Sequence, residues 1–119
     1  VVEFLESFFA DLNTQKDPTL FRHFDTRASI ESLSLRTILH QGQWSILLDV
    51  LRNVQSMRLS SVTFQIGHEI GTINGILHTA TSFPPTAHFV NEYEITVIRT
   101  LDGWKVLETR YVTHHQNHA

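Results

Sequence analysis

The sequence contains no cysteine among its 119 residues, so disulfides, thiolate zinc sites and a cysteine nucleophile are all excluded. Positive charge is also scarce, because 9 Lys and Arg stand against 12 Asp and Glu, for a formal net charge of −3 at pH 7. This balance supplies no basic field for a polyanion. We therefore expect no nucleic-acid partner.

Long hydrophobic runs are missing as well. The longest early apolar segment, VVEFLESFFADL, carries three acids and is too short to cross a bilayer, so we expect a soluble protein without a membrane partner. The chain begins at Val1 without Met, and we expect a trimmed chain whose targeting segment is absent, which leaves the compartment undetermined. Without a glycine-rich phosphate loop, a G-x-S-x-G elbow or an H-E-x-x-H motif, we expect no cofactor and no metal.

Apolar residues at helical spacing predict three helices in the first half of the chain. The first covers residues 1–14, and the second covers residues 18–24, where Asp17 caps a helix that begins with Pro18. The third covers residues 43–57 and has a single apolar stripe, formed by Trp44, Leu47, Leu48, Leu51 and Val54.

Strands are predicted in the remaining segments, where apolar and polar residues alternate. These segments are residues 28–41, read as one bent or two short strands, and residues 59–70, 73–83, 88–101 and 104–113. Helices followed by antiparallel strands predict an α+β domain with helices on one sheet face. We expect a single domain over residues 1–113 and a flexible, His-rich tail over residues 114–119.

Three segments, FLESFFADLNTQKDPTLFRHFD, HQGQW and LDGWKVLETRYV, resemble those of the NTF2-like superfamily, which includes nuclear transport factor 2, ketosteroid isomerase and the SnoaL-type polyketide cyclases. The resemblance implies a cone in which three N-terminal helices pack on a strongly curved, mostly antiparallel sheet around a pocket. Ketosteroid isomerase has an Asp base on its first strand, and the matching position here is Ser32, which cannot take a proton near neutral pH. Glu31 is adjacent and is expected to face the other way.

The last two strands carry the leading pocket residues. A two-residue turn at Asp102-Gly103 pairs Leu101 with Trp104 and places Tyr93, Glu108 and Arg110 on the inner face. Glu108 and Arg110 are then either ligand-binding residues or a structural ion pair at the rim. On the opposite face we expect a dimer interface or a merely solvated surface, and its apolar members are Val90, Ile98, Leu107 and Tyr111.

Two further residues are candidates for the pocket. His68 interrupts an apolar series and is expected to look inward, as a core residue or as a catalyst beside Glu108 or Tyr93. Trp44 is expected either to bind ligand or to belong to the core. His78 is a second inward candidate of the same kind as His68. The histidines of the tail are expected to hold no metal, because adjacent imidazoles on an extended chain point in opposite directions.

These observations support three hypotheses. The first is a noncatalytic NTF2-like module that forms a homodimer through the sheet and binds a small apolar ligand or a protein partner. The alternative is a SnoaL-like or ketosteroid isomerase-like enzyme (proton transfer, cyclase or isomerase) on a cyclic carbonyl substrate, with His68 or Glu108 as base and Tyr93 or Arg110 stabilising the enolate. The third is a structural module that assembles through the sheet without a ligand.

Overall fold

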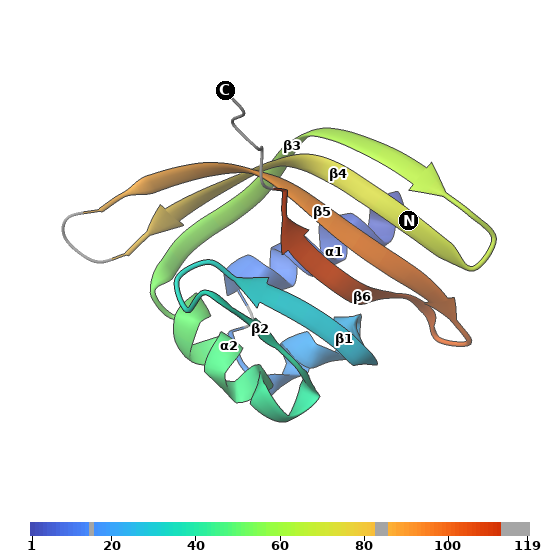
Figure 1. Cartoon of the computed structure of the whole chain (residues 1–119), viewed down its shortest axis with the longest axis horizontal. Helices are drawn as coiled ribbons and strands as arrows, with labels where there is room; N and C mark the ends of the chain where they lie inside the picture. Colours follow the sequence, from blue (N-terminus) through green and yellow to red (C-terminus); the bar gives the residue numbers. More distant parts are fainter. Residues whose placement is uncertain (15, 83–85, 113–119) are drawn as a thin grey trace, which may run out of the picture.

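The computed structural model describes residues 1–14, 16–82 and 86–112, so the predicted tail over residues 114–119 lies outside the described residues. Within these ranges, six strands form one curved sheet in the order β2-β1-β6-β5-β4-β3, and the helices lie against its inner face (Figure 1). The mixed α+β arrangement is confirmed. In the part of the chain that is described, no helix has the length and apolar character needed to span a membrane.

Among the described residues, four helical segments precede β3. They are α1 (Val2–Thr14), the 3₁₀ helices η1 (Pro18–His23) and η2 (Gln41–Gln43), and α2 (Trp44–Leu51). The Asp17 carboxylate accepts a hydrogen bond of 2.9 Å from the backbone N–H of Thr19, which is the predicted cap of the second helix. That helix is a tight 3₁₀ segment and not an α-helix, because six residues cannot complete a stable α-helical run.

The third predicted helix is too long. It ends at Leu51, and Val54 already belongs to a strand. Gln55 is an extra residue in the pairing with the next strand, so Val54 and Met57 both face inward although three positions separate them. This β-bulge produces the same spacing of apolar residues as a helix, which explains why the periodicity was misleading.

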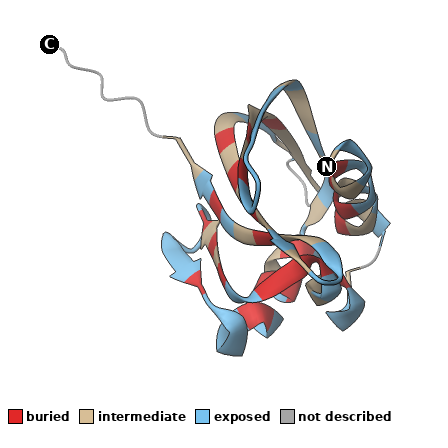
Figure 2. Ribbon diagram, turned by 90° about the vertical axis from the view of Figure 1, so that its right-hand side faces the viewer, coloured by how far each residue is buried: buried red, intermediate tan, exposed pale blue. Residues whose placement is uncertain are grey.

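The strands pair antiparallel except for β1 and β6, which run parallel. Their bounds are β1 (Phe24–Ser32), β2 (Thr37–Leu39), β3 (Val54–Ile66), β4 (Ile70–Thr81), β5 (His88–Thr100) and β6 (Gly103–Tyr111). Buried residues gather where the sheet faces the helices (Figure 2). Ile73, Ile95 and Val97 are completely buried on this inner face.

A bulge in β3 bends the edge of the sheet. Ser61 and Val62 together lie opposite Gly75 of β4, and Ser61 has a left-handed φ of 52°. A side chain at Gly75 would collide with this bulge, because an added Cβ would lie 2.7 Å from Leu59 Cγ. Glycine therefore permits the close approach of the two strands that produces the curvature.

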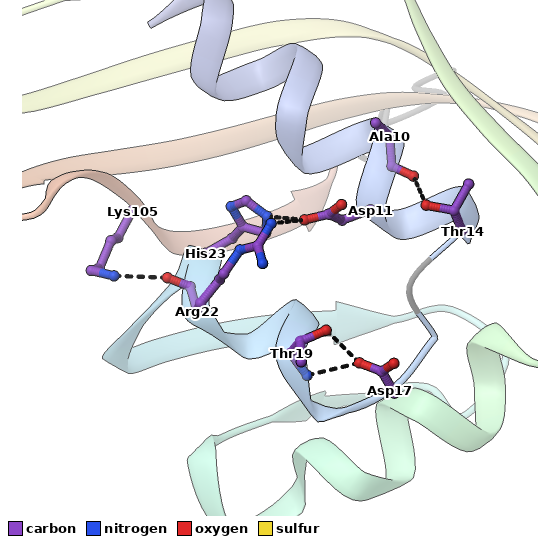
Figure 3. Close-up of polar contacts among 8 residues, drawn as sticks. All are labelled: Ala10, Asp11, Thr14, Asp17, Thr19, Arg22, His23 and Lys105. Carbon is purple, nitrogen blue, oxygen red and sulfur yellow. Dashed lines mark hydrogen bonds and ion pairs between the residues drawn. The ribbon is translucent and has the colours of Figure 1, made fainter.

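A polar cluster joins the first helical segments to the sheet (Figure 3). Asp11 Oδ2 of α1 lies 2.6 Å from His23 Nε2 and 2.7 Å from Arg22 Nη2, so one carboxylate holds both residues at the end of η1. The ring of His23 also packs edge-on against Phe8. Lys105 Nζ of β6 donates a 2.7 Å hydrogen bond to the carbonyl of Arg22. These contacts fix α1 against the sheet at one end of the core.

Candidate functional site

A cavity of about 580 Å³ lies between the helices and the inner face of the sheet. This volume is within the range typical of small-molecule sites. Its apolar walls come from both α-helices and from several strands, and include Phe8, Leu12, Leu47, Leu51, Ile30 and Met57. The three long apolar side chains at the rim, Leu33, Leu35 and Phe89, are about half exposed. The cavity therefore opens between the β1–β2 turn and the start of β5.

Polar groups of three strands meet in the cavity wall. Tyr93 of β5 lies directly opposite Tyr111 of β6, and their ring centroids are 4.9 Å apart. Thr109, two residues before Tyr111, is 3% exposed, and its hydroxyl has no hydrogen-bond partner among the described residues. Glu31 of β1 lines the same cavity. This stretch of the wall thus combines the hydroxyl groups of Tyr93, Tyr111 and Thr109 with the carboxyl group of Glu31.

Both tyrosines are held in their neutral form. Burial is the main cause that raises the pKa of Tyr93 above its ordinary value, and the neighbouring Tyr111 and Glu31 raise it further. The Thr109 hydroxyl is close enough to lower the Tyr93 pKa slightly, although the geometry of a full hydrogen bond is not met. Burial, and then the charge of Glu31, also raise the pKa of Tyr111. Near neutral pH both phenols therefore stay protonated and are available as hydrogen-bond donors.

Glu31 lines the cavity although it alternates with the buried Ile30 and Ser32 along β1, as the strand period of two predicts. Its Oε1 atom accepts a 2.7 Å hydrogen bond from the backbone N–H of Tyr111, just beyond Ile30 and Thr109, the last residues paired between β1 and β6. The carboxylate therefore continues the strand pairing where the backbone ladder stops. Ser32 is 6% exposed in the cavity wall, and its hydroxyl accepts a 3.3 Å hydrogen bond from Leu35 N in the following turn.

The predicted register of the last hairpin is wrong. Thr100 lies opposite Gly103, so the turn contains Leu101 and Asp102, and Leu101 is fully exposed instead of facing inward. Gly103 has a φ of 103°, which explains why glycine follows the aspartate. Farther along, Val97 pairs with Val106 but Thr96 pairs with Glu108, so a β-bulge at Leu107 reverses the inward and outward positions.

This bulge removes Glu108 and Arg110 from the predicted pocket. Both residues are exposed on the outer face, where Arg110 Nε donates a 2.6 Å hydrogen bond to Glu94 Oε1. The alternative prediction, an ion pair between Glu108 and Arg110, is also wrong, because Arg110 pairs with Glu94 of β5. Of the three strand residues predicted to face inward together, only Tyr93 lines the cavity.

Tyr111 is also on the other face of the sheet from the one predicted. The sequence assigned it to the outer interface, whereas the bulge turns it into the cavity beside Tyr93. Two other predicted interface residues are on the outer face, since Val90 pairs with His78 and Ile98 pairs with Ile70. Val90 is 62% exposed, and Ile98 is partly buried. Leu107 is the bulged residue itself and is also partly buried.

The two histidine candidates lie outside the cavity. His68 is exposed in the turn between β3 and β4, so the alternation that placed it inside stops at Ile66. His78 faces outward and its Nε2 lies 2.8 Å from the hydroxyl of Ser60. Gly71, which lies between two predicted strands, is buried within β4. Within the described ranges, no three His, Asp or Glu side chains gather as a metal site, and the histidine tail lies outside those ranges.

Trp44 is buried in an aromatic cluster and does not line the cavity. Its ring centroid lies 5.2 Å from that of Phe21 and 5.1 Å from that of Phe24. Of its two predicted roles, the position in the core is the one that its surroundings support, because the ring packs behind the cavity wall. Asp25 lies within β1 and is paired with Arg27.

One sequence signal could have found the missing site residues. Apolar residues occupy even positions at Trp104 and Val106, whereas charged residues occupy the even positions Glu108 and Arg110. Such a change of phase within one strand indicates a bulge, and it points Thr109 and Tyr111 inward. No comparable signal in the sequence identifies Glu31.

Comparison with known proteins extends this description. Neither a family model nor the sequence of a curated protein matches the chain. Solved structures are similar across nearly its whole length. A protein from Xanthomonas campestris, assigned as a calcium/calmodulin-dependent protein kinase II association domain, has a TM-score of 0.82 and 7% identity, covering 98% of this chain and 86% of that one.

Two other solved structures are also similar to most of this chain. An NTF2-like protein with a cystatin-like fold from Novosphingobium aromaticivorans has a TM-score of 0.76 and 11% identity, covering 97% of this chain and 80% of that one. A protein from Shewanella frigidimarina assigned as a ketosteroid isomerase has a TM-score of 0.75 and 11% identity, covering 92% of each chain. The mixed α+β fold with a curved sheet that the resemblance implies is confirmed, and similar structures are assigned both as a ketosteroid isomerase and as an association domain.

Proposed function

We propose that this NTF2-like fold serves as a noncatalytic module that holds a small apolar molecule in the cavity between its helices and its sheet. The observation that carries the proposal is a cavity of about 580 Å³ with largely apolar walls. The ionisable groups among its described lining residues are Glu31, Tyr93 and Tyr111. The tyrosines stay protonated near neutral pH, and Ser32 stands where a catalytic carboxylate is expected.

Blocking the cavity tests this proposal. Thr79 lies on the inner face of β4 and lines the cavity, so Thr79→Trp is expected to fill it and lower the affinity for apolar molecules by about tenfold or more. Thr72→Trp is the matched control, because Thr72 faces outward on the same strand, opposite Thr96. Binding of a panel of steroids, aromatic polyketides and fatty acids is measured by native mass spectrometry.

The result is read from the difference between the two variants. Loss of binding in Thr79→Trp alone supports the cavity as the site. Equal binding by both variants, or no bound compound with the unmodified protein, contradicts the proposal. A compound that is released chemically changed favours an enzyme instead.

A second candidate function is proton transfer on a cyclic carbonyl compound. It is favoured by the position of Glu31 in the cavity beside the two tyrosines, where a carboxylate base and phenol donors lie close together. The bases that the sequence suggested, His68 and Glu108, lie outside the cavity and do not support it. One oxygen of Glu31 already accepts the Tyr111 N–H, so we rank this function second.

We also propose that the outer face of the sheet joins two copies of the chain. Ile70 and Val90 are more than half exposed there, and Ile98 lies directly opposite Ile70. Similarity to a kinase association domain adds support.

Val90→Asp is expected to convert a dimer to a monomer in sedimentation velocity, because a buried unpaired carboxylate is costly. Leu101→Asp, at the fully exposed hairpin tip, is the control. An unchanged mass for Val90→Asp would contradict the dimer.

A further inference from the structure

We infer that the polar part of the cavity selects a ligand that carries a neutral hydroxyl group on an otherwise apolar body. This inference rests on the proposed ligand-binding function and adds the chemical class of the ligand. It is carried by the arrangement of Thr109, Tyr93, Tyr111 and Glu31 in one stretch of the cavity wall. These residues come from three neighbouring strands, β5, β6 and β1.

Thr109 supplies the first observation. Its side chain is 3% exposed and lines the cavity, and its hydroxyl lies near the Tyr93 phenol but has no hydrogen-bond partner of good geometry among the described residues. A buried hydroxyl without a partner is costly, and valine would fill the same space without that cost. A ligand group that bonds to the hydroxyl accounts for threonine at this position.

The neighbouring groups decide what that ligand group is. The tyrosines offer hydrogen-bond donors, since burial keeps the pKa of each phenol above its ordinary value. Glu31 offers only acceptor positions, and one of its oxygens is bonded to the Tyr111 N–H. A ketone can accept hydrogen bonds from the hydroxyls but has no hydrogen to donate to the carboxylate. A hydroxyl group accepts and donates, so it satisfies both sides of the network.

Charge, hydration and hydrogen-bonding capacity disfavour the other common polar groups. A carboxylate ligand would be repelled by Glu31 within a wall of low polarity, where repulsion is only weakly screened. An ammonium group would be attracted by Glu31, but it would lose its hydration and, having no acceptor, would leave the hydrogen-bond donors of Thr109 and the tyrosines unsatisfied. The neutral hydroxyl is the group that the wall fits in every respect.

Matched derivatives of one apolar body test the inference. The probes are 2-adamantanol, 2-adamantanone, 2-aminoadamantane and adamantane-2-carboxylate, and their dissociation constants are measured by isothermal titration calorimetry at neutral pH. We expect 2-adamantanol to bind about tenfold more tightly than the ketone and far more tightly than either ion. Equal affinities across the series, or tightest binding by an ion, would overturn the inference but leave the proposed function standing. If none of the probes binds, and the broader ligand panel is not retained either, it is the proposed function that fails.

Thr109→Val separates a role in recognition from a structural role. The variant is expected to bind 2-adamantanol about tenfold more weakly, while the midpoint of its thermal unfolding rises by roughly 4 °C without ligand. Thr96→Val is the control, because Thr96 lies on the outer face opposite Glu108, and it should leave the affinity unchanged. Tyr111→Phe is the second variant and is also expected to weaken binding of the alcohol. Unchanged affinity in both cavity variants would overturn the inference.

Discussion

Replacing Gly75 with alanine is expected to lower the free energy of unfolding by about 2 to 3 kcal/mol. The added Cβ would lie 2.7 Å from Leu59 Cγ and 2.9 Å from the carbonyl oxygen of Ser60. The second contact is with backbone, which cannot move aside without disturbing the bulge at Ser61. The measurement is equilibrium unfolding in urea, with the free energy taken from the linear extrapolation.

Gly42→Ala provides the matched control for this prediction. No atom lies within 4 Å of the position that a Cβ would take at Gly42, and its φ is not in the left-handed region. Alanine there is expected to be neutral or slightly stabilising, because it restricts the unfolded chain. If Gly75→Ala cost no more than Gly42→Ala, close packing of β3 on β4 would not be what requires glycine.

Alkaline pH is expected to destabilise the protein through Tyr93. Burial raises the pKa of this phenol in the folded state, while the unfolded chain releases the proton near its ordinary pKa of about 10. Above that pH the unfolded state binds fewer protons than the folded state, so the free energy of unfolding falls as pH rises. One such group contributes a slope of about 1.4 kcal/mol per pH unit. The stabilisation is complete below about pH 10 and is lost progressively above it.

Urea unfolding measured at a series of alkaline pH values checks this prediction. Tyr93→Phe should show a slope that is shallower by about 1.4 kcal/mol per pH unit, while the contribution of the lysines stays the same in both proteins. The sequence has 2 tyrosines, and the pKa of each is raised in the fold. Tyrosinate absorbance should therefore appear at a higher pH in the folded protein than in the unfolded chain. Full ionisation near pH 10 without unfolding would contradict the expected burial.

The sequence predicted which helices and strands form more accurately than it predicted the residues at which they end. The face of α1 that carries Leu5, Phe8 and Leu12 is buried as the helical spacing indicates. The last helix was extended past Leu51, because Val54 and Met57 continue its spacing. A strand with a bulge at Gln55 places both side chains on the inner face, so the same spacing fits two structures. Propensity and periodicity cannot choose between them without the neighbouring strand.

The candidate site was predicted only in part, and Tyr93 is the residue that was placed correctly. The errors at Glu108, Arg110 and Tyr111 share one cause, the extra residue at Leu107. A strand has a period of two, so one inserted residue moves every later side chain to the other face. The error is therefore large although the local change is a single residue.

By itself, the sequence determined the class of the fold, the apolar face of its first helix and the exclusion of thiol chemistry. These properties depend on residue type and on spacing along the chain, which the sequence contains. Only the tertiary structure decided which polar groups meet, because the bulges at Gln55, Ser61 and Leu107 form through pairing with a second strand. Pairing between distant segments brought Glu31, Tyr93 and Thr109 into one cavity, and no local pattern encodes that meeting.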